Sequence, residues 1–136
     1  MDYASMIART NEQNRFMTHN YMTLTQMWED HAVVELTLRE ESRNLFGGVH
    51  GGALFTMADC AAGSAARSRG MRYVTLNNSF EFFSSSKSNR LRAIASVRHR
   101  GRTICVLSVD VKDGEDKLIA GGTFTMFATG ELETNA

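Results

Sequence analysis

The fold of this chain is decided by residues 51–67, which read GGALFTMADCAAGSAAR. Apolar side chains occur on nearly every side of the helix that this stretch predicts, so we expect a buried helix rather than an amphipathic one. Five alanines, one glycine and one serine between residues 58 and 66 allow a sheet to approach its backbone closely. Arg67 and Arg69 suit the carboxyl end of the helix dipole, and Gly70 ends the helix.

Stretches of alternating apolar and polar residues on both sides of this helix predict β-strands. They are Tyr21–Trp28, His31–Leu38, Tyr73–Phe83 and the runs around residues 91–97, 105–111 and 118–126. Two turn signals, Arg100-Gly101 and Asp113-Gly114, separate the last three runs. Short turns between alternating strands predict an antiparallel meander.

Four apolar residues of the first strand after the helix share one parity: Val74, Leu76, Phe80 and Phe82. We therefore expect them to face the same side of the sheet. Residues 1–20 read as one short amphipathic helix with a polar end. Together these elements predict an α+β fold, in which an antiparallel sheet of five or six strands wraps around one long central helix.

Length and composition limit the class of protein. The chain has 136 residues, which predicts a single domain over 1–136, and its formal net charge is zero. That balance argues against a nucleic-acid backbone or an anionic membrane as the main partner. No secretory signal or membrane-spanning run is expected. Cys60 and Cys105 follow no metal or disulfide spacing, so we expect two reduced core residues in a cytoplasmic protein.

A sheet wrapped around one helix leaves its outer face and its edge strands uncovered in a chain of this length. Uncovered edges tend to pair with another strand. We therefore expect the chain to form a homo-oligomer.

The stretch before the central helix contains four glycines in six residues, namely Gly47, Gly48, Gly51 and Gly52. One explanation is a sharp strand-to-helix turn with close helix packing. The other is functional, because Gly51 and Gly52 leave the first N–H groups of the helix open to a carbonyl oxygen that gains negative charge. A phosphate-binding loop is disfavoured, since no Lys-Ser or Lys-Thr pair follows the glycines.

Asp59 is the only carboxylate between His50 and Arg67. Its neighbours three and four residues away include no cation, so no local ion pair explains it. It is either a residue on a solvated helix face or a nucleophile or general base in an apolar cleft. With the glycine N–H groups, the imidazole of His50 and the amide of Asn44, it forms a set suited to hydrolysing an activated acyl group.

Basic residues gather around a predicted hairpin turn, at Arg98, Arg100 and Arg102, and Lys87 and Arg90 lie near the end of the preceding strand, after a run of three serines. They are either a solvated hairpin tip or a small clamp for one or two phosphates. Since the chain as a whole is neutral, such a clamp suits a phosphorylated small molecule better than a polynucleotide.

The run Asn44…Gly47…His50-Gly51-Gly52…Asp59, followed by the strand Tyr73–Phe83, resembles the hotdog-fold acyl-CoA thioesterases of the 4-hydroxybenzoyl-CoA thioesterase superfamily. The subfamily it resembles is typified by the phenylacetate-pathway thioesterase. The resemblance covers roughly residues 30 to 129. It implies a homodimer joined edge to edge, dimers that often pair into a homotetramer, and an active site at the dimer interface.

The resemblance also implies a role for individual residues. The N–H of Gly51 would polarise the thioester carbonyl, and Asp59 from the other subunit would activate water or attack the carbonyl. Asn44 would hold the nucleophile or water, and His50 would orient the thioester. Thr75 stands where the family often has a Ser or Thr that helps to place the water.

Substrate-binding residues are implied as well. Gly48 and Gly52 would shape the glycine loop. Phe82 and Phe83 would line a tunnel for the acyl group, although both are equally compatible with a core position. The phosphates of coenzyme A would meet Arg98, Arg100 or Arg102. The segment after Phe83 lacks the proline that often follows this strand in relatives, so the tunnel is expected to differ there.

The sequence therefore predicts an acyl-CoA thioesterase that releases a free acid and coenzyme A, with no metal and no cofactor beyond the coenzyme A of its substrate. Two alternatives stay open. One is a non-catalytic acyl-CoA-binding or sensor protein on the same fold, and the other is a hotdog enoyl-CoA hydratase. The acyl group is not specified, because hydrophobic pockets separate similar chains by only ~1–3 kcal/mol per methylene.

Overall fold

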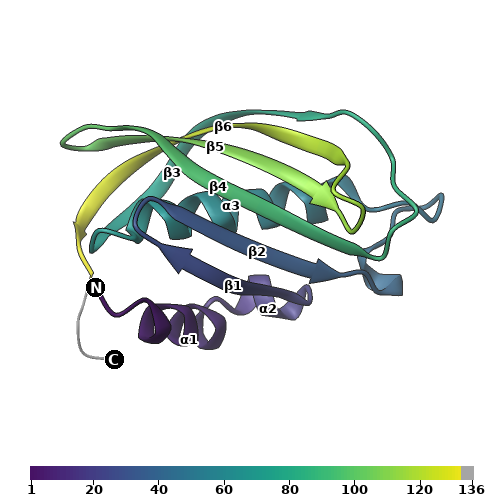
Figure 1. Ribbon diagram of the computed structural model, residues 1–136, viewed down its shortest axis with the longest axis horizontal. Helices are drawn as coiled ribbons and strands as arrows, with labels where there is room; N and C mark the ends of the chain where they lie inside the picture. Colours follow the sequence, from purple (N-terminus) through teal and green to yellow (C-terminus); the bar gives the residue numbers. More distant parts are fainter. Residues whose placement is uncertain (133–136) are drawn as a thin grey trace.

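The apolar stretch of residues 51–67 forms helix α3 (Gly51–Arg67) in the computed structural model, which describes residues 1–132. The antiparallel sheet curls around this helix, as predicted (Figure 1). Five alanines of α3 are fully buried against the sheet: Ala58, Ala61, Ala62, Ala65 and Ala66. Their small side chains let every strand come near the helix backbone. The last four residues of the predicted domain 1–136 lie outside the described part.

Six strands make up one sheet. They are β1 (Met22–Trp28), β2 (His31–Thr37), β3 (Met71–Phe82), β4 (Arg90–Arg100), β5 (Ile104–Asp113) and β6 (Leu118–Glu131), and η1 (Glu40–Ser42) is a short 3-10 turn after β2. The spatial order is β1-β2-β4-β5-β6-β3, all antiparallel. The predicted meander of the last three strands is confirmed. Strand β3 pairs with β6 at the far edge, and residues 83–89 cross back to β4.

A β-bulge in β3 overturns the predicted parity of its apolar residues. The register with β6 shifts between Thr75 and Asn77, which leaves Leu76 as the extra residue. Before the bulge, Thr75 faces α3, since its hydroxyl bonds to a carboxylate there. After it, Phe80 faces α3 and packs on Phe124 at 5.9 Å between ring centroids. Val74 therefore faces outward, and Phe80 faces inward, although both hold even positions.

The N-terminal segment forms two helices instead of the single one predicted, α1 (Tyr3–Gln13) and α2 (Arg15–His19). Asn14 separates them, because it ends α1 and its side chain accepts from the Met17 N–H at the start of α2. Helix α1 lies beside β1 (Figure 1). The amide of Asn11 bonds to both backbone groups of Leu24, donating to the carbonyl at 2.9 Å and accepting from the N–H at 2.8 Å.

The two edges of the sheet therefore differ. Edge β1 is covered in part by α1, so the prediction of two uncovered edges is wrong on that side. Edge β3 pairs only with β6 among residues 1–132, and no residue of this 12-residue strand is fully buried. Its exposed apolar side chains include Val74 and Leu76, each half exposed. A long apolar edge of this kind is a template for another strand.

Within the described residues no helix is long and apolar enough to cross a membrane.

Gly122 of β6 tests this packing of β3. A Cβ at this position would collide with the backbone carbonyl of Ser79 in β3, and neither backbone can move alone. We expect Gly122→Ala to lower the free energy of unfolding by about 3 kcal/mol, since overpacking forces the strands apart. Urea denaturation at fixed protein concentration measures the loss. Thr123→Ala, at the next position and on the other face, serves as the control, and equal stability of the two variants would contradict the account.

Candidate active site

The loop before α3 is folded by Asn44. Its Oδ1 accepts from the N–H of Phe46 at 2.9 Å and from that of Gly48 at 3.0 Å, and its own N–H donates to the Gly48 carbonyl at 2.8 Å. Gly47, between them, has φ +85°, a conformation that favours glycine. Asn44 is exposed, and its hydrogen bonds hold the glycine loop in place.

His50 is the N-cap of α3, and its Nδ1 accepts from the Gly52 N–H at 2.8 Å. A Cβ on residue 52 would stand 2.9 Å from that nitrogen, so glycine is required for the cap. The His50 cap accepts a hydrogen bond from the N–H of Gly52 but not from the N–H of Gly51. Among residues 1–132, no acceptor bonds to the Gly51 N–H, which is one of the unpaired donors at the positive end of the helix dipole.

A groove of about 440 Å³ runs over this helix start. The loop before α3, the end of β3 and the segment after it form its walls. Its lining includes Asn44, Gly48, Gly51, Phe82 and Phe83, together with Val49, Leu54, Ser84, Ser85, Ser86 and Ile119. The ring of Phe82 lies over Gly51, 3.5 Å from where a Cβ of residue 51 would stand. Gly51 thus lines a partly apolar groove, and an unpaired N–H in such surroundings is suited to polarising a carbonyl.

Asp59 lies farther along α3 and is half buried. The hydroxyl of Thr75 in β3 donates to its Oδ1 at 2.7 Å, which fixes the orientation of the carboxylate. No ion pair of the described residues involves it. Its neighbour Cys60 is a free thiol, and burial raises the pKa of that thiol to about 11. Since the thiolate is the reactive form, Asp59 is the better candidate for the reacting group.

Within one chain the site is therefore in two parts. One part is the groove, which is lined by the glycine loop, Phe82 and Phe83. The other part is the hydrogen-bonded pair of Asp59 and Thr75. Eight residues separate Asp59 from Gly51 on one helix, which is about 12 Å along its axis. A carboxylate at that distance cannot act on a carbonyl that is bonded to the Gly51 N–H of its own chain.

The predicted clamp on the hairpin between β4 and β5 lies at the other end of α3 (Figure 1). Arg98 and Arg102 are exposed there. Arg100 is not free, which corrects the prediction for this residue. Its guanidinium bonds to Asp30 at 2.9 Å and to the Tyr73 hydroxyl and the Ala66 carbonyl at 3.0 Å each. It holds the carboxyl end of α3 to the β1–β2 turn.

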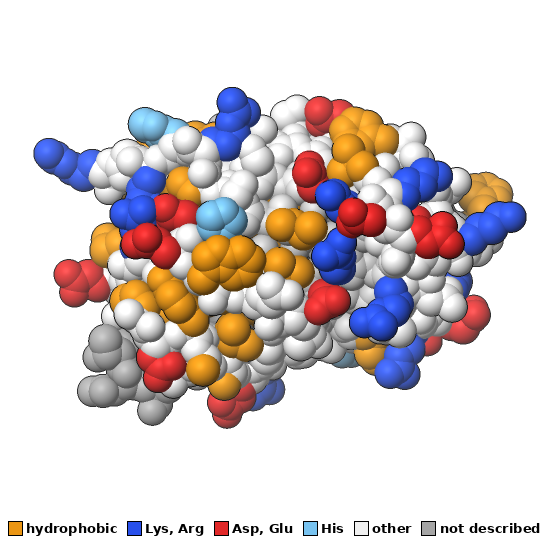
Figure 2. All heavy atoms as spheres, in the orientation of Figure 1, with side chains coloured by type: hydrophobic (Ala, Val, Ile, Leu, Met, Phe, Trp, Pro, Cys, Tyr) orange, Lys and Arg blue, Asp and Glu red, His pale blue; other side chains and the backbone are white. Residues whose placement is uncertain are grey.

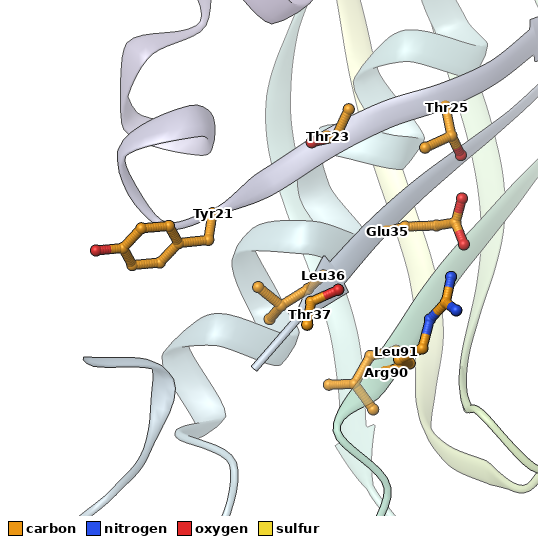
Figure 3. A pocket seen from close by; sticks show the side chains of 8 residues that line it. All are labelled: Tyr21, Thr23, Thr25, Glu35, Leu36, Thr37, Arg90 and Leu91. Carbon is orange, nitrogen blue, oxygen red and sulfur yellow. The ribbon is translucent and has the colours of Figure 1, made fainter. Parts of the chain in front are cut away.

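The outer face of the sheet offers a second, smaller hollow of about 250 Å³, over β1, β2 and β4 (Figure 3). Glu35 and Arg90 point toward one another across it, and Tyr21 lies at its rim. Charged side chains of both signs cover much of this face (Figure 2). Of the residues named for a possible site, the hollow contains only Arg90. Among residues 1–132, no group of three or more His, Cys, Asp and Glu side chains is placed to hold a metal ion.

Sequence reasoning missed part of the groove wall. Leu54 belongs to the helix that is predicted to be buried, Ile119 has no predicted role, and no local signal separates a groove wall from a core. The sequence shows the serine run of residues 84–86 but does not predict that it lines the groove. Arg43 was not singled out, although its guanidinium joins the Gly47 carbonyl to the Asn89 side chain at 3.0 and 3.1 Å and so ties the two walls together.

Comparison with known proteins agrees with this geometry. Residues 46–120 match the model of the family described as the thioesterase superfamily. The acyl-coenzyme A thioesterase PaaI of Escherichia coli is 30% identical over 112 residues, which cover 75% of this chain and 80% of the relative. Its solved structure superimposes with a TM-score of 0.88 at 26% identity, covering 95% of each chain.

A hypothetical thioesterase of Streptococcus pneumoniae, solved with coenzyme A, has a TM-score of 0.83 and 31% identity over 91% of this chain and 99% of its own. A Streptococcus mutans protein bound to acetyl CoA has a TM-score of 0.77 and 32% identity over 82% of this chain and 91% of its own. The predicted hotdog architecture is confirmed by these neighbours.

The network around Asp30 makes a prediction about acid stability. The hydrogen bond from Arg69, with a further one from Arg100, holds the pKa of the Asp30 carboxyl below its ordinary value of 3.8. A lowered pKa stabilises the fold above that value, and the contribution is lost as the pH falls below it. We expect Arg100→Met to cost about 3 kcal/mol at pH 7 and clearly less at pH 3.

Urea denaturation of both proteins at the two pH values measures this difference. Arg98→Met, an exposed arginine two residues away, is the control and stays within about 0.5 kcal/mol of the parent. A loss that is the same at pH 7 and pH 3 would contradict the role of the Asp30 pair.

Proposed function

The chain belongs to the thioesterase superfamily, and from this premise we propose that it hydrolyses acyl-CoA thioesters to a free acid and coenzyme A. The observation that carries the proposal is that Gly51 lines the groove and that its N–H has no acceptor among residues 1–132. A thioester carbonyl bonded there gains a donor that stabilises its developing negative charge. The relatives that were solved with coenzyme A and acetyl CoA support the same substrate class.

Asp59 is proposed as the general base or nucleophile. Its orientation by the Thr75 hydroxyl, and the absence of a direct ion pair to it among residues 1–132, suit either role. Two further structures of the pneumococcal relative are of single-residue variants, one with an aspartate and one with a threonine replaced by alanine. Those residues are sixteen positions apart, as are Asp59 and Thr75 here. The equal spacing supports the pairing of these two residues in the mechanism.

The missing contact between Asp59 and Gly51 is proposed to form in a homodimer. Edge β3 is long and carries apolar residues, and within residues 1–132 no strand pairs with its outer side, whereas β1 is partly covered by α1. Pairing of two β3 edges about a two-fold axis continues the sheet and reverses the direction of the second α3. If Asp59 of one chain then faces Gly51 of the other, symmetry gives two identical sites. A further pairing of dimers into a tetramer stays a proposal from the resemblance.

In the proposed reaction, Asp59 takes a proton from water while the water oxygen bonds to the thioester carbon. The carbonyl oxygen becomes negative and is held by the Gly51 N–H. When the carbonyl re-forms, the C–S bond breaks, and the leaving thiolate takes the proton from Asp59. In the alternative route an Asp59 carboxylate oxygen attacks the carbon itself, the C–S bond breaks, and coenzyme A leaves as a thiolate. Water then hydrolyses the mixed anhydride to the free acid and Asp59, and the proton released passes to the thiolate.

The remaining groove residues have supporting roles in the proposal. Asn44 and Gly48 keep the loop in shape, and His50 holds the helix start through the Gly52 N–H. Phe82 and Phe83 offer apolar surface to the acyl group, and broad specificity is expected. We place the reaction in the cytoplasm, where two free cysteines stay reduced.

A screen of acetyl, hexanoyl, palmitoyl, benzoyl and phenylacetyl thioesters by thiol release tests the proposed hydrolysis. An enoyl-CoA is tested for water addition in the same screen.

The oxyanion donor is tested by replacing Gly51 with proline. Position 51 is the first residue of α3, and His50 before it has φ −66° and ψ 131°, which is compatible with a following proline. The proline removes the N–H and keeps the helix. We expect kcat to fall about 10²- to 10³-fold with an unchanged circular dichroism spectrum. Gly51→Ala, which retains the N–H, is the matched control and loses far less. Equal kcat values for the two variants would remove this donor from the mechanism.

The carboxylate is tested with Asp59→Asn, which keeps the shape and the hydrogen bond from Thr75. We expect kcat to fall by roughly 10²- to 10⁴-fold, while KM changes little, because the base acts in the reaction and not in binding. Thiol release from the best substrate of the screen measures both constants. Turnover at the parent rate would exclude Asp59 as base and as nucleophile.

A further inference from the structure

We propose that Arg67 is a positioning residue for Asp59: its guanidinium lies over Gly63, in the same row of side chains along α3, and stabilises the ionised form of the Asp59 carboxylate without a direct ion pair. The proposal rests on the proposed function, in which Asp59 is the base or nucleophile. It adds the residue that maintains the charge of this carboxylate.

Asp59, Gly63 and Arg67 follow one another at intervals of four residues, so they form one row along α3. Arg67 Nη2 donates to Ser64 Oγ at 3.1 Å, and Arg67 Nη1 is 3.0 Å from where a Cβ of residue 63 would stand. The side chain therefore turns back toward the amino end of α3 and crosses the space that glycine leaves open. Its guanidinium is then about 6 Å along the axis from residue 59, half of the roughly 12 Å between the two backbone positions.

Strands β3 and β6 pack over this row with uncharged side chains. Met126 of β6 lies over Gly63, with its methyl carbon 3.9 Å from the position of that Cβ. The partner of Met126 in β3 is Thr75, whose hydroxyl donates to Asp59 Oδ1. The same pair of strands thus covers both the carboxylate and the guanidinium, and partly buried charges are screened less than exposed ones.

The other polar groups around this row are neutral or already engaged. Cys60 is a free thiol, and the amide of Asn14, between α1 and α2, lies 3.7 Å from its sulfur. The Tyr73 hydroxyl of β3 accepts from Arg100 at 3.0 Å, and Arg100 is paired with Asp30. Within residues 1–132, none of these groups places a free negative charge beside the row.

The charge of Asp59 is the one that acts on Arg67 at neutral pH. Arg67 is partly buried and takes part in no ion pair among residues 1–132. Burial lowers the pKa of its guanidinium, and the charges of Cys60 and Asp59 oppose that shift. Because burial raises the pKa of the Cys60 thiol to about 11, that thiol is uncharged at pH 7. The attraction is mutual, so the guanidinium favours the ionised form of Asp59.

The helix dipole does not explain the orientation of Arg67, although the sequence predicts an interaction with the carboxyl end of α3. The guanidinium points away from that end. Arg100 occupies it instead, and donates to the carbonyl oxygens of Ala66 at 3.0 Å and of Ala65 at 3.3 Å. Among residues 1–132, the hydrogen bond from the Arg67 side chain goes to Ser64 and not to a carbonyl.

A cation at this distance suits a reacting carboxylate better than an ion pair does. A direct ion pair would occupy the carboxylate oxygens that must take a proton or attack carbon. In the structure Thr75 bonds to Oδ1 of Asp59, and Oδ2 has no hydrogen-bond partner among residues 1–132. Arg67 therefore supports the charge and leaves Oδ2 open to the reaction.

Titration of the Asp59 carboxyl group tests the proposal without any substrate. It is followed by ¹³C NMR of protein labelled at the aspartate carboxyl carbons, in which Asp59→Asn identifies the signal by its absence. We expect the titration midpoint to rise by about one pH unit in Arg67→Met, a tenfold change in the protonation equilibrium, because the favourable charge is lost. Arg67→Lys, which keeps the charge, should stay within about 0.3 pH unit of the parent.

Two further variants separate charge from packing. Arg67→Gln keeps a donor for Ser64 without the charge, and its midpoint should move as in Arg67→Met. Arg92→Met removes a positive charge from β4, and its midpoint should not move. The acidic limb of kcat/KM for thiol release should shift to higher pH with the NMR midpoint, because it reports the same group.

An unchanged Asp59 midpoint in both Arg67→Met and Arg67→Gln overturns the proposal, as does an equal shift in Arg92→Met or in Arg67→Lys. Failure of the proposed function has a different signature. The NMR midpoint then still depends on the charge at residue 67, while the parent hydrolyses none of the thioesters of the screen.

Discussion

The proposed site of this protein depends on one backbone donor, the N–H of Gly51, which has no acceptor among residues 1–132. The cap of α3 is satisfied at Gly52, which leaves the Gly51 N–H without an acceptor at the positive end of a 17-residue helix. The carboxylate suited to work with that donor, Asp59, is on the same helix and about 12 Å away. Because a helix is rigid over this distance, one chain has both halves of the proposed site and cannot bring them together. The two halves meet only if a second helix runs alongside in the opposite direction.

The two edge strands of the sheet, β1 and β3, differ in how freely another strand can pair with them. Asn11 occupies backbone groups of β1, which hinders another strand from pairing there. Strand β3 keeps its outer edge open and carries Thr75, the residue that orients Asp59. In the proposal the same strand therefore serves both the dimer contact and the reaction. A bulge at Leu76 makes this possible, since it turns Thr75 and Phe80 to the same side of the sheet.

The sequence predicted most features that arise within a few residues of each other. The central helix has its predicted bounds, and the motif from Asn44 to Gly52 folds as a capped helix start because its hydrogen bonds are local. The errors have non-local causes. Arg100 pairs with Asp30, 70 positions away in the chain. The bulge in β3 follows from its pairing with β6, so parity alone placed Val74 and Phe80 on one face.

The central claim is that Gly51 of one chain works with Asp59 of the other, and subunit complementation tests it most directly. Two inactive variants, Gly51→Pro and Asp59→Asn, are unfolded together, refolded as a one-to-one mixture and assayed for thiol release. Random pairing makes half of the dimers mixed, and each mixed dimer has one intact site of two, so about a quarter of the parent activity is expected. A mixture that contains mixed dimers, shown by native mass spectrometry, and yet stays inactive would contradict the account.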